Sequence, residues 1–226
     1  MIGATMSMMM NSGNKNMKSK IESNLCIVSE YVKGGSLRSY LLKNRDKKLL
    51  MKMVIQFALD IAKGLSYLHS KKIIHFDVKP DNILIDDEYK LKLVDFGGSV
   101  FRPFGGLFLM CGENGTRGYM APEILRRKLC GQKCDVYSFG ICLWEIYSCD
   151  IAYPYDSGNK TIDVYKERPS IPVKCPRSMA RLITQCWDTD PRNRPEMKEV
   201  VVELEKMMKY EGWQAMSQVE KVASGY

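Results

Sequence analysis

Two short segments contain most of the residues in this chain that could carry out chemistry. Asp77 and Lys79 stand two positions apart in the stretch HFDVKPDN, which ends at Asn82, and a DFG triplet begins at Asp95. A carboxylate can accept a proton, an ammonium group can neutralise a phosphate, and the side-chain oxygens of Asn82 and Asp95 are hard ligands of the kind that Mg2+ prefers. Phosphoryl transfer needs little more, because its catalysis is mostly positioning and charge neutralisation.

A predicted hairpin would bring these two segments together. Residues 83–85 (ILI) and 91–94 (LKLV) are short apolar runs separated by a polar turn. Because the two ends of an antiparallel hairpin are neighbours, Asn82 and Asp95 should lie close together, with the upstream acid and lysine facing the same spot. Taken singly, a loop aspartate is usually solvated and a DFG triplet is usually a turn. The two segments at this spacing favour a functional site.

The rest of the chain predicts a mainly helical domain. A run of strand length at residues 25–28 precedes a KGGS turn, in which Ser36 would cap the following helix. Residues 7–24 are polar and predict a loop or a disordered insert, and residues 210–226 predict a loose tail. Helices are predicted where apolar residues recur with helical spacing, at residues 52–70, about 135–147, near 179–186 and near 198–208.

Composition indicates a soluble domain with one hydrophobic core and with cysteines in the reduced state. The chain has 226 residues, of which 45% are hydrophobic, and a net charge of +8. The basic residues are scattered with no aromatic ladder between them, which argues against nucleic-acid binding. Eight cysteines without a C-x-x-C pair, and only two histidines, favour reduced cytoplasmic thiols over zinc or disulfides. The sequence contains neither a signal peptide nor an apolar run long enough to span a membrane.

The motifs together resemble those of protein kinases. The family's catalytic-loop pattern is H-R-D-x-K-x-x-N, followed by D-F-G and A-P-E. Counterparts of these motifs, of a central helix, of a closing signature and of the hinge stand at residues 75–82, 95–97, 115–123, 135–140, 186–195 and 27–37. The resemblance runs from about residue 25 to 208. In phrases such as GLSYLHS and GICLWEIY it is to plant Raf-like Ser/Thr kinases of the MAP kinase kinase kinase type.

The resemblance implies an α+β, protein-kinase-like fold, consisting mainly of the α-helical C-lobe with a remnant of the N-lobe sheet. It divides the chain into an N-lobe remnant strand and insert (1–24), a kinase domain of hinge and C-lobe (25–209) and a C-terminal tail (210–226). Residues 1–6 resemble the strand shortly before the hinge.

The implied activity is transfer of the γ-phosphate of ATP to serine or threonine hydroxyls of a protein substrate, with Mg2+ as cofactor. Asp77 would be the catalytic base, Lys79 would steady the transferring phosphate, and Asn82 and Asp95 would hold Mg2+. The spacing of Lys79, with Thr116 in the Gly-Thr pair, resembles Ser/Thr rather than tyrosine kinases.

By the same resemblance, other residues would bind adenine or support the scaffold. Ser29 would be the gatekeeper, and the backbones of Glu30 and Val32 would hold adenine. The resemblance further implies that Asp135 braces the catalytic loop by binding the backbone amides of that loop. It also implies a buried ion pair between Glu123 and Arg194.

The sequence departs from the kinase pattern in three places. No G-x-G-x-x-G precedes Asp77 and no lysine stands in a V-A-I-K context, so the chain resembles an N-terminally truncated kinase with a weakened grip on ATP. Phe76 replaces the arginine that grips an activation-segment phosphate, and residues 98–115 are apolar with a single hydroxyl, Ser99. Residues 155–171 are polar and short for the family, which predicts a deformed helix.

Three interpretations follow from these departures. The chain is an active Ser/Thr kinase impaired by the missing parts, a catalytically inactive pseudokinase-like module that holds a protein partner at its apolar activation segment, or a truncated gene product. The sequence leaves all three open.

Overall fold

The structure is a computed structural model of the 226-residue chain. It describes residues 3–7, 24–104, 106–109, 115–154 and 167–223, and within these ranges it describes the side chains of residues 29–211 other than Leu109. Most of the predicted insert (residues 8–23) and most of the stretch predicted to hold a deformed helix (residues 155–166) lie outside the described residues.

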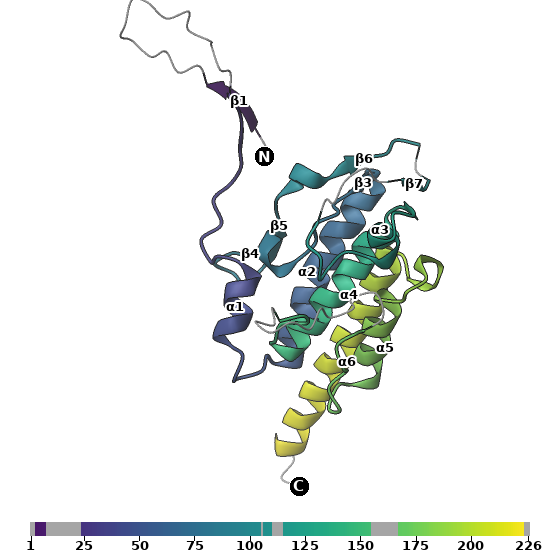
Figure 1. Ribbon diagram of the computed structural model, residues 1–226. Helices are drawn as coiled ribbons and strands as arrows, with labels where there is room; N and C mark the ends of the chain where they lie inside the picture. The colour runs from purple at the N-terminus through teal and green to yellow at the C-terminus, as the bar shows by residue number, and fades with distance from the viewer. Residues whose placement is uncertain (1–2, 8–23, 105, 110–114, 155–166, 224–226) are drawn as a thin grey trace, which may run out of the picture.

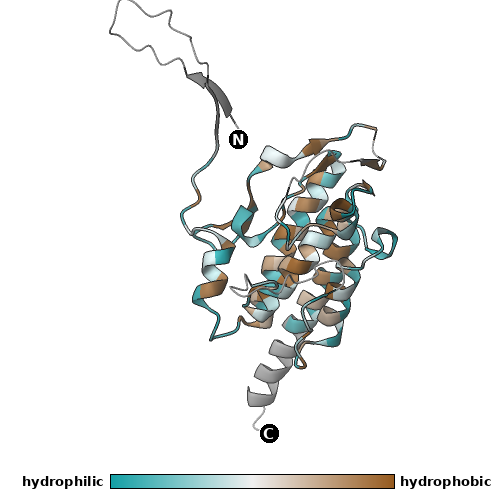
Figure 2. Cartoon of the chain, in the orientation of Figure 1, coloured by the Kyte–Doolittle hydropathy of each residue, from teal (hydrophilic) through white to brown (hydrophobic). Residues whose placement is uncertain are grey.

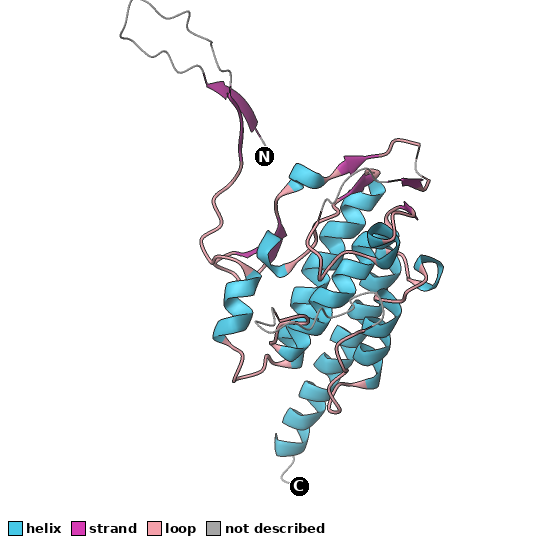
Figure 3. Cartoon of the chain, viewed as in Figure 1, coloured by secondary structure: helices cyan, strands magenta, loops and turns pink. Residues whose placement is uncertain are grey.

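Long helices packed side by side form the body of the molecule (Figures 1 and 3). Figure 2 shows hydrophobic residues distributed along these helices. Buried apolar residues of the four helices belong to one hydrophobic cluster. The apolar positions predicted along the first of them, including Val54, Phe57 and Leu65, are all buried. The helices are α2 (Met51–Ser70), α4 (Lys133–Ser148), α5 (Arg177–Cys186) and α6 (Met197–Ala223).

Helix α4 is the centre of this body. Every residue from Cys134 to Ile146 is buried, because the helix packs against α2 and α5 and is enclosed on all sides. Gly140 lets α5 approach closely, since a Cβ atom there would lie only 2.9 Å from the Cβ of Cys186. The strongly apolar helix predicted over about residues 135–147 is therefore confirmed.

Helix α6 begins where the sequence predicted a helix but continues much further. Residues 210–223, which were expected to be a loose tail, continue the helical backbone to Ala223. This stretch contains no proline, and half of its residues are glutamate, glutamine, alanine or lysine, which favour helices. The backbone of residues 210–223 is therefore helical where a loose tail was predicted.

A short hairpin, β4 (Ile83–Ile85) with β5 (Leu91–Leu93), follows the candidate catalytic segment as predicted. The strands are antiparallel, with Ile83 opposite Leu93. The Asp86 carboxylate closes the turn by accepting hydrogen bonds from the backbone N–H groups of Glu88 and Lys90, each at 2.9 Å. This ribbon is the element that sets the distance between the two chemical segments.

Residues 34–36 run along the other side of β4 and lead into α1 (Leu37–Lys43). The Gly34 N–H donates to the Ile85 carbonyl at 3.0 Å, and Ser36 bridges to Leu84. Only glycine fits at position 34, because a Cβ atom there would lie 2.3 Å from the Ile85 oxygen. The Ser36 hydroxyl accepts a hydrogen bond from the Ser39 N–H at 3.2 Å, so the predicted N-cap is confirmed.

Strands β1 (Gly3–Ser7) and β2 (Asn24–Val28) form a separate antiparallel pair, with Gly3 opposite Val28. Figure 1 shows this pair extending away from the helical body. Together with the small sheets near the site, it gives the predicted α+β architecture, which is mainly helical with a small N-terminal sheet.

The remaining elements are short and come between the long helices in the order of the chain. In the part of the chain that the structure describes, no helix has both the length and the apolar character needed to cross a membrane. The short elements are β3 (Ile73–Ile74), η1 (Pro80–Asn82), η2 (Phe96–Gly98), β6 (Val100–Phe101), β7 (Phe108–Leu109), α3 (Pro122–Leu125), β8 (Leu129–Cys130) and η3 (Pro191–Asn193).

Candidate active site

The loop that precedes β4 begins at His75 and is anchored by Asp135, a fully buried residue in the first turn of α4. Its carboxylate accepts hydrogen bonds from the backbone N–H groups of His75 and Phe76, each at 2.9 Å. It also lies 2.9 Å from the Nε2 atom of His69. The expectation that Asp135 braces this loop through its amides is confirmed, and the buried charge is stabilised by these donors.

Three of the predicted site residues meet in one hydrogen-bonded cluster, together with Thr116. One oxygen of the Asp77 carboxylate accepts from Lys79 Nζ and from Asn82 Nδ2, each at 2.8 Å. The other accepts from the Thr116 hydroxyl at 2.9 Å. Lys79 Nζ also donates to the Thr116 hydroxyl at 2.7 Å. A carboxylate, an ammonium group and two polar side chains thus face one spot.

The cluster keeps Asp77 ionised. Partial burial alone would raise the pKa of the Asp77 carboxyl, but the hydrogen bonds from Lys79 and Thr116 and the charge of Lys79 together hold that pKa below its ordinary value. Asp77 is therefore an anion at neutral pH, and three donors set the orientation of its carboxylate.

Asn82 and Asp95 are brought together through the hairpin and its flanking residues. The Val94 N–H donates to the Asn82 carbonyl at 3.0 Å, and His75 Nε2 lies 3.1 Å from the Val94 carbonyl. Asp95 follows directly, in a left-handed conformation (φ 63°), and its exposed carboxylate accepts from the Gly97 N–H at 3.4 Å. The backbones are adjacent as predicted, while the described contacts do not join the Asp95 carboxylate to the Asp77 cluster.

The donor set at this place suits a hard cation. The Asn82 amide uses its nitrogen for both of its bonds, to the Asp77 carboxylate and to the Asp77 carbonyl at 3.0 Å. The described hydrogen bonds do not use its oxygen Oδ1, and the Asp95 carboxylate is exposed. One or two protein oxygens, completed by water and phosphates, are what Mg2+ requires.

The predicted adenine-binding residues lie in an irregular segment between β2 and α1. Ser29 and Glu30 are exposed and Val32 is half-buried. The Glu30 carboxylate lies 3.0 Å from Lys92 Nζ on β5, which places this segment beside the hairpin that carries the cluster. The described contacts do not join Ser29, Glu30 or Val32 to the Asp77 cluster directly.

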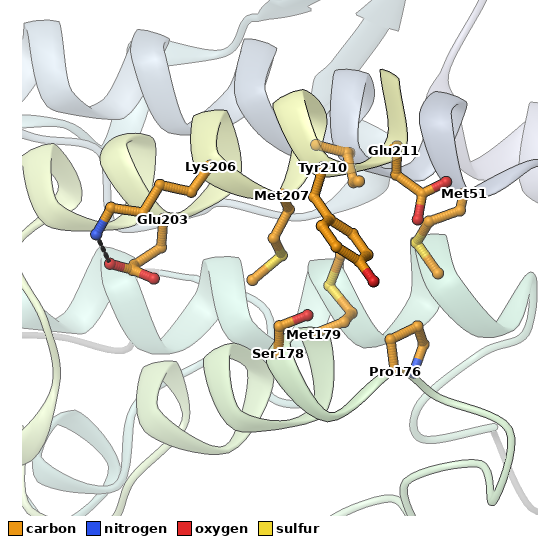
Figure 4. Close-up of a pocket in the computed structure, with 10 residues that line it drawn as sticks. Met51, Pro176, Ser178, Met179, Glu203, Lys206, Met207, Tyr210 and Glu211 are labelled. Carbon is orange, nitrogen blue, oxygen red and sulfur yellow. Dashed lines mark hydrogen bonds and ion pairs between the residues drawn. The ribbon is translucent and has the colours of Figure 1, made fainter. Parts of the chain in front are cut away.

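A separate pocket of about 360 Å3 lies between the start of α2, the start of α5 and the middle of α6 (Figure 4). Its walls are largely apolar and come from residues such as Met51, Met179 and Met207. Its Glu203 and Lys206 are paired with each other at 2.7 Å. None of the predicted site residues lines this pocket.

Comparison with known proteins identifies the family. A sequence profile described as "Protein tyrosine and serine/threonine kinase" matches residues 6–204. The chain belongs to the protein kinase family. It is 39% identical over 189 residues to serine/threonine/tyrosine-protein kinase HT1 of Arabidopsis thaliana, which covers 80% of this chain and 47% of that protein.

Other kinase relatives show the same pattern of coverage. The probable serine/threonine-protein kinase drkD of Dictyostelium discoideum is 38% identical over 192 residues, covering 81% of this chain and 14% of that protein. Serine/threonine-protein kinase STY46 of Arabidopsis thaliana is 36% identical over 191 residues, covering 83% of this chain and 33% of that protein. The chain thus spans about half, or less, of the length of these curated relatives.

The kinase scaffold pair predicted from the closing signature is present. The Arg194 guanidinium binds the Glu123 carboxylate through two parallel contacts of 2.7 and 2.8 Å, with both side chains buried. It also donates to the backbone carbonyls of Asp188 and Lys133, at 2.8 and 2.9 Å. The expected buried ion pair is confirmed, and its remaining donors are satisfied as a buried guanidinium requires.

Phe76 stands where the kinase pattern has arginine, and it anchors the activation segment by packing. Its ring is buried and meets the Phe108 ring edge-on, with centroids 5.9 Å apart and an interplanar angle of 87°. The Arg102 guanidinium covers the Phe108 ring at 4.6 Å. Strand β7, which begins at Phe108, pairs with β8. The segment is therefore held here by aromatic contacts.

Sequence reasoning missed Thr116 as a member of the cluster, and it also missed Arg38 and Tyr119. Thr116 was noted only as an indicator of hydroxyl specificity. Its position six residues before the Pro122-Glu123 pair was the available signal. Arg38 and Tyr119 carried no such signal, because their contact joins residues 81 positions apart in the chain.

Proposed function

We propose that this chain is a protein serine/threonine kinase domain that transfers the γ-phosphate of ATP to hydroxyl groups of a protein. The observation that carries the proposal is the cluster in which Asp77 is held by Lys79, Asn82 and Thr116. It combines an oriented proton acceptor with a positive charge, and these are the protein groups that phosphoryl transfer requires. Several curated relatives are named as serine/threonine kinases.

In the proposed reaction, Asp77 accepts the proton of the substrate hydroxyl. The hydroxyl oxygen bonds to the γ-phosphorus, the bond from that phosphorus to the β,γ-bridging oxygen breaks, and ADP leaves with that oxygen. Lys79, 2.8 Å from Asp77, neutralises charge on the phosphoryl group as it moves. Asn82 and Asp95 would hold Mg2+, which when bound neutralises the phosphates. The backbones of Glu30 and Val32 would hold adenine beside the gatekeeper Ser29.

Other parts of the proposal concern affinity, subtype and location. The sequence has no Gly-rich loop or V-A-I-K lysine before Asp77, so we expect this chain to hold MgATP weakly. The phrases shared with Raf-like kinases support assignment to that group and a role in signalling. Five of the described cysteines are free thiols, which supports a cytoplasmic location: Cys134, Cys142, Cys149, Cys175 and Cys186.

Phosphate transfer from labelled ATP at millimolar MgATP tests the proposal. The wild-type chain should label serine and threonine in a mixed protein substrate. Asp77→Asn should reduce the rate by about 10²- to 10⁴-fold, the usual contribution of a general base. Asp87→Asn is the matched control, because Asp87 is an exposed acid in the β4–β5 turn. Labelling that is equal in wild type and Asp77→Asn would refute the proposal.

A second candidate function, a partner-binding module without catalysis, is favoured by one observation. Phe101, Phe104 and Leu107 of the activation segment are exposed, and Phe104 is fully so. Exposed aromatic side chains gathered in one segment are typical of interaction sites. The transfer assay separates the two candidates, because a wild-type chain that transfers no phosphate at millimolar MgATP would favour the binding module.

A further inference from the structure

Arg38 links three separate parts of the molecule beside the candidate active site. It lies in the first turn of α1, and its side chain is only 16% exposed. Its guanidinium lies 3.1 Å from the Glu145 carboxylate and 3.4 Å from that of Asp81. It also donates a hydrogen bond to the Tyr119 hydroxyl. The phosphoryl-transfer steps proposed above do not use any of these four side chains.

Glu145 fixes the position of this arginine. The carboxylate is fully buried in α4, and it accepts hydrogen bonds from the Tyr119 hydroxyl at 2.9 Å and from the Ala152 N–H at 2.8 Å. Burial raises the pKa of Glu145, while Arg38 opposes that rise. A buried charge that loses its partner is strongly destabilising. The Arg38 guanidinium is therefore held beside the Glu145 carboxylate, where the two form an ion pair.

The other two partners of Arg38 belong to two different loops of the site. Asp81 stands between Lys79 and Asn82 in the catalytic loop. Tyr119 belongs to a tight turn over residues 116–120, in which its N–H donates to the Thr116 carbonyl at 2.8 Å. Thr116 joins these loops at the reactive end, through Asp77 and Lys79. Arg38 joins the same two loops through Asp81 and Tyr119.

We propose that Arg38 is a positioning residue that holds the catalytic loop and the 116–120 turn in one relative arrangement. It also ties both loops to α1, which directly follows the predicted adenine-binding segment. A shift of α1 would reach both loops through the Arg38 side chain. The linkage itself is geometric, and only its consequence for phosphate transfer rests on the proposed function.

Amide hydrogen exchange of the full chain, measured by mass spectrometry, tests this role without nucleotide. Arg38→Met should speed exchange by about tenfold or more in both residues 77–82 and residues 116–120, because local opening becomes easier there. Exchange in α4 and α5 should stay unchanged. Arg45→Met is the matched control, because Arg45 forms an exposed ion pair with Asp150 at 2.7 Å just beyond α1. It should leave both loops unchanged.

A second variant separates positioning from general loss of structure. Asp81→Asn removes the negative charge from one arm of the linkage at a half-exposed site, so it should speed exchange in residues 77–82 and leave residues 116–120 unchanged. The proposal is overturned if Arg38→Met affects neither loop, only one loop, or the whole chain equally. If Arg38→Met does not fold, an Asp81→Asn chain without selective loosening overturns it. Failure of the transfer assay would leave these results intact, so the two proposals fail separately.

Discussion

At the residue scale, the most constrained group in the site is the Asp77 carboxylate. Its two oxygens receive three hydrogen bonds, from Lys79, Asn82 and Thr116, so its orientation is set before any substrate arrives. Such preorganisation avoids reorientation during the reaction. The same donors lower the pKa of Asp77 against the opposing effect of burial. Ionisation, orientation and stability are therefore coupled at this residue.

This coupling predicts how stability depends on pH. The pKa of Asp77 is lower in the folded state than its unfolded value of about 3.9, so the carboxylate stabilises the fold above that pH. This contribution should be lost as pH falls through the folded pKa. Asp77→Asn should therefore show a shallower acid-induced loss of unfolding free energy than wild type, measured by urea denaturation between about pH 2 and pH 6. A variant with an unchanged acid dependence would contradict the proposed ionisation.

At the element scale, the β4–β5 hairpin is the element that assembles the site. It is supported on one side by residues 34–36 and closed at its turn by Asp86. Gly34 is critical to this support, because its backbone lies against the Ile85 carbonyl with no room for a side chain. The segment leading from β2 to α1 is thereby fixed to the strand that follows Asn82.

Gly34→Ala should therefore destabilise the fold by about 1–3 kcal/mol, because the added methyl group forces residues 34–36 away from β4. Gly98→Ala is the matched control, since a Cβ atom at Gly98 would meet nothing within 4 Å. It should change the unfolding free energy by less than about 1 kcal/mol. Urea denaturation of both variants measures the difference. Equal stabilities would show that residues 34–36 are not held closely against the hairpin.

The elements also show what sequence could and could not predict. The hairpin, the Ser36 cap, the buried face of α2 and the apolar helix α4 follow from local patterns, and all were predicted. The place of Thr116 in the cluster could not be predicted in this way. It depends on tertiary contacts with Lys79 and Asp77, which precede Thr116 by 37 and 39 positions in the chain. The edge-on packing of Phe76 on Phe108 likewise comes from tertiary structure.

At the scale of the whole molecule, a central buried helix carries both the anchor of the catalytic loop and the anchor of Arg38. Asp135 at one end of α4 holds the loop amides, and Glu145 near its other end holds the arginine. The chain belongs to the protein kinase family. The proposed function therefore depends on one site being formed where the loops held by Asp135 and Arg38 meet.

The most direct test of that claim is paramagnetic NMR with Mn2+ and ATP, because Mn2+ replaces Mg2+ at oxygen sites and broadens nearby amide signals. We expect broadening centred on residues 77–82 and 94–97, with a midpoint in the millimolar range of ATP. Asp95→Ala should abolish it, and the exposed control Asp87→Ala should not. Broadening centred elsewhere, or unchanged by Asp95→Ala, would contradict the claim that Asp77, Lys79, Asn82 and Asp95 form one nucleotide and metal site.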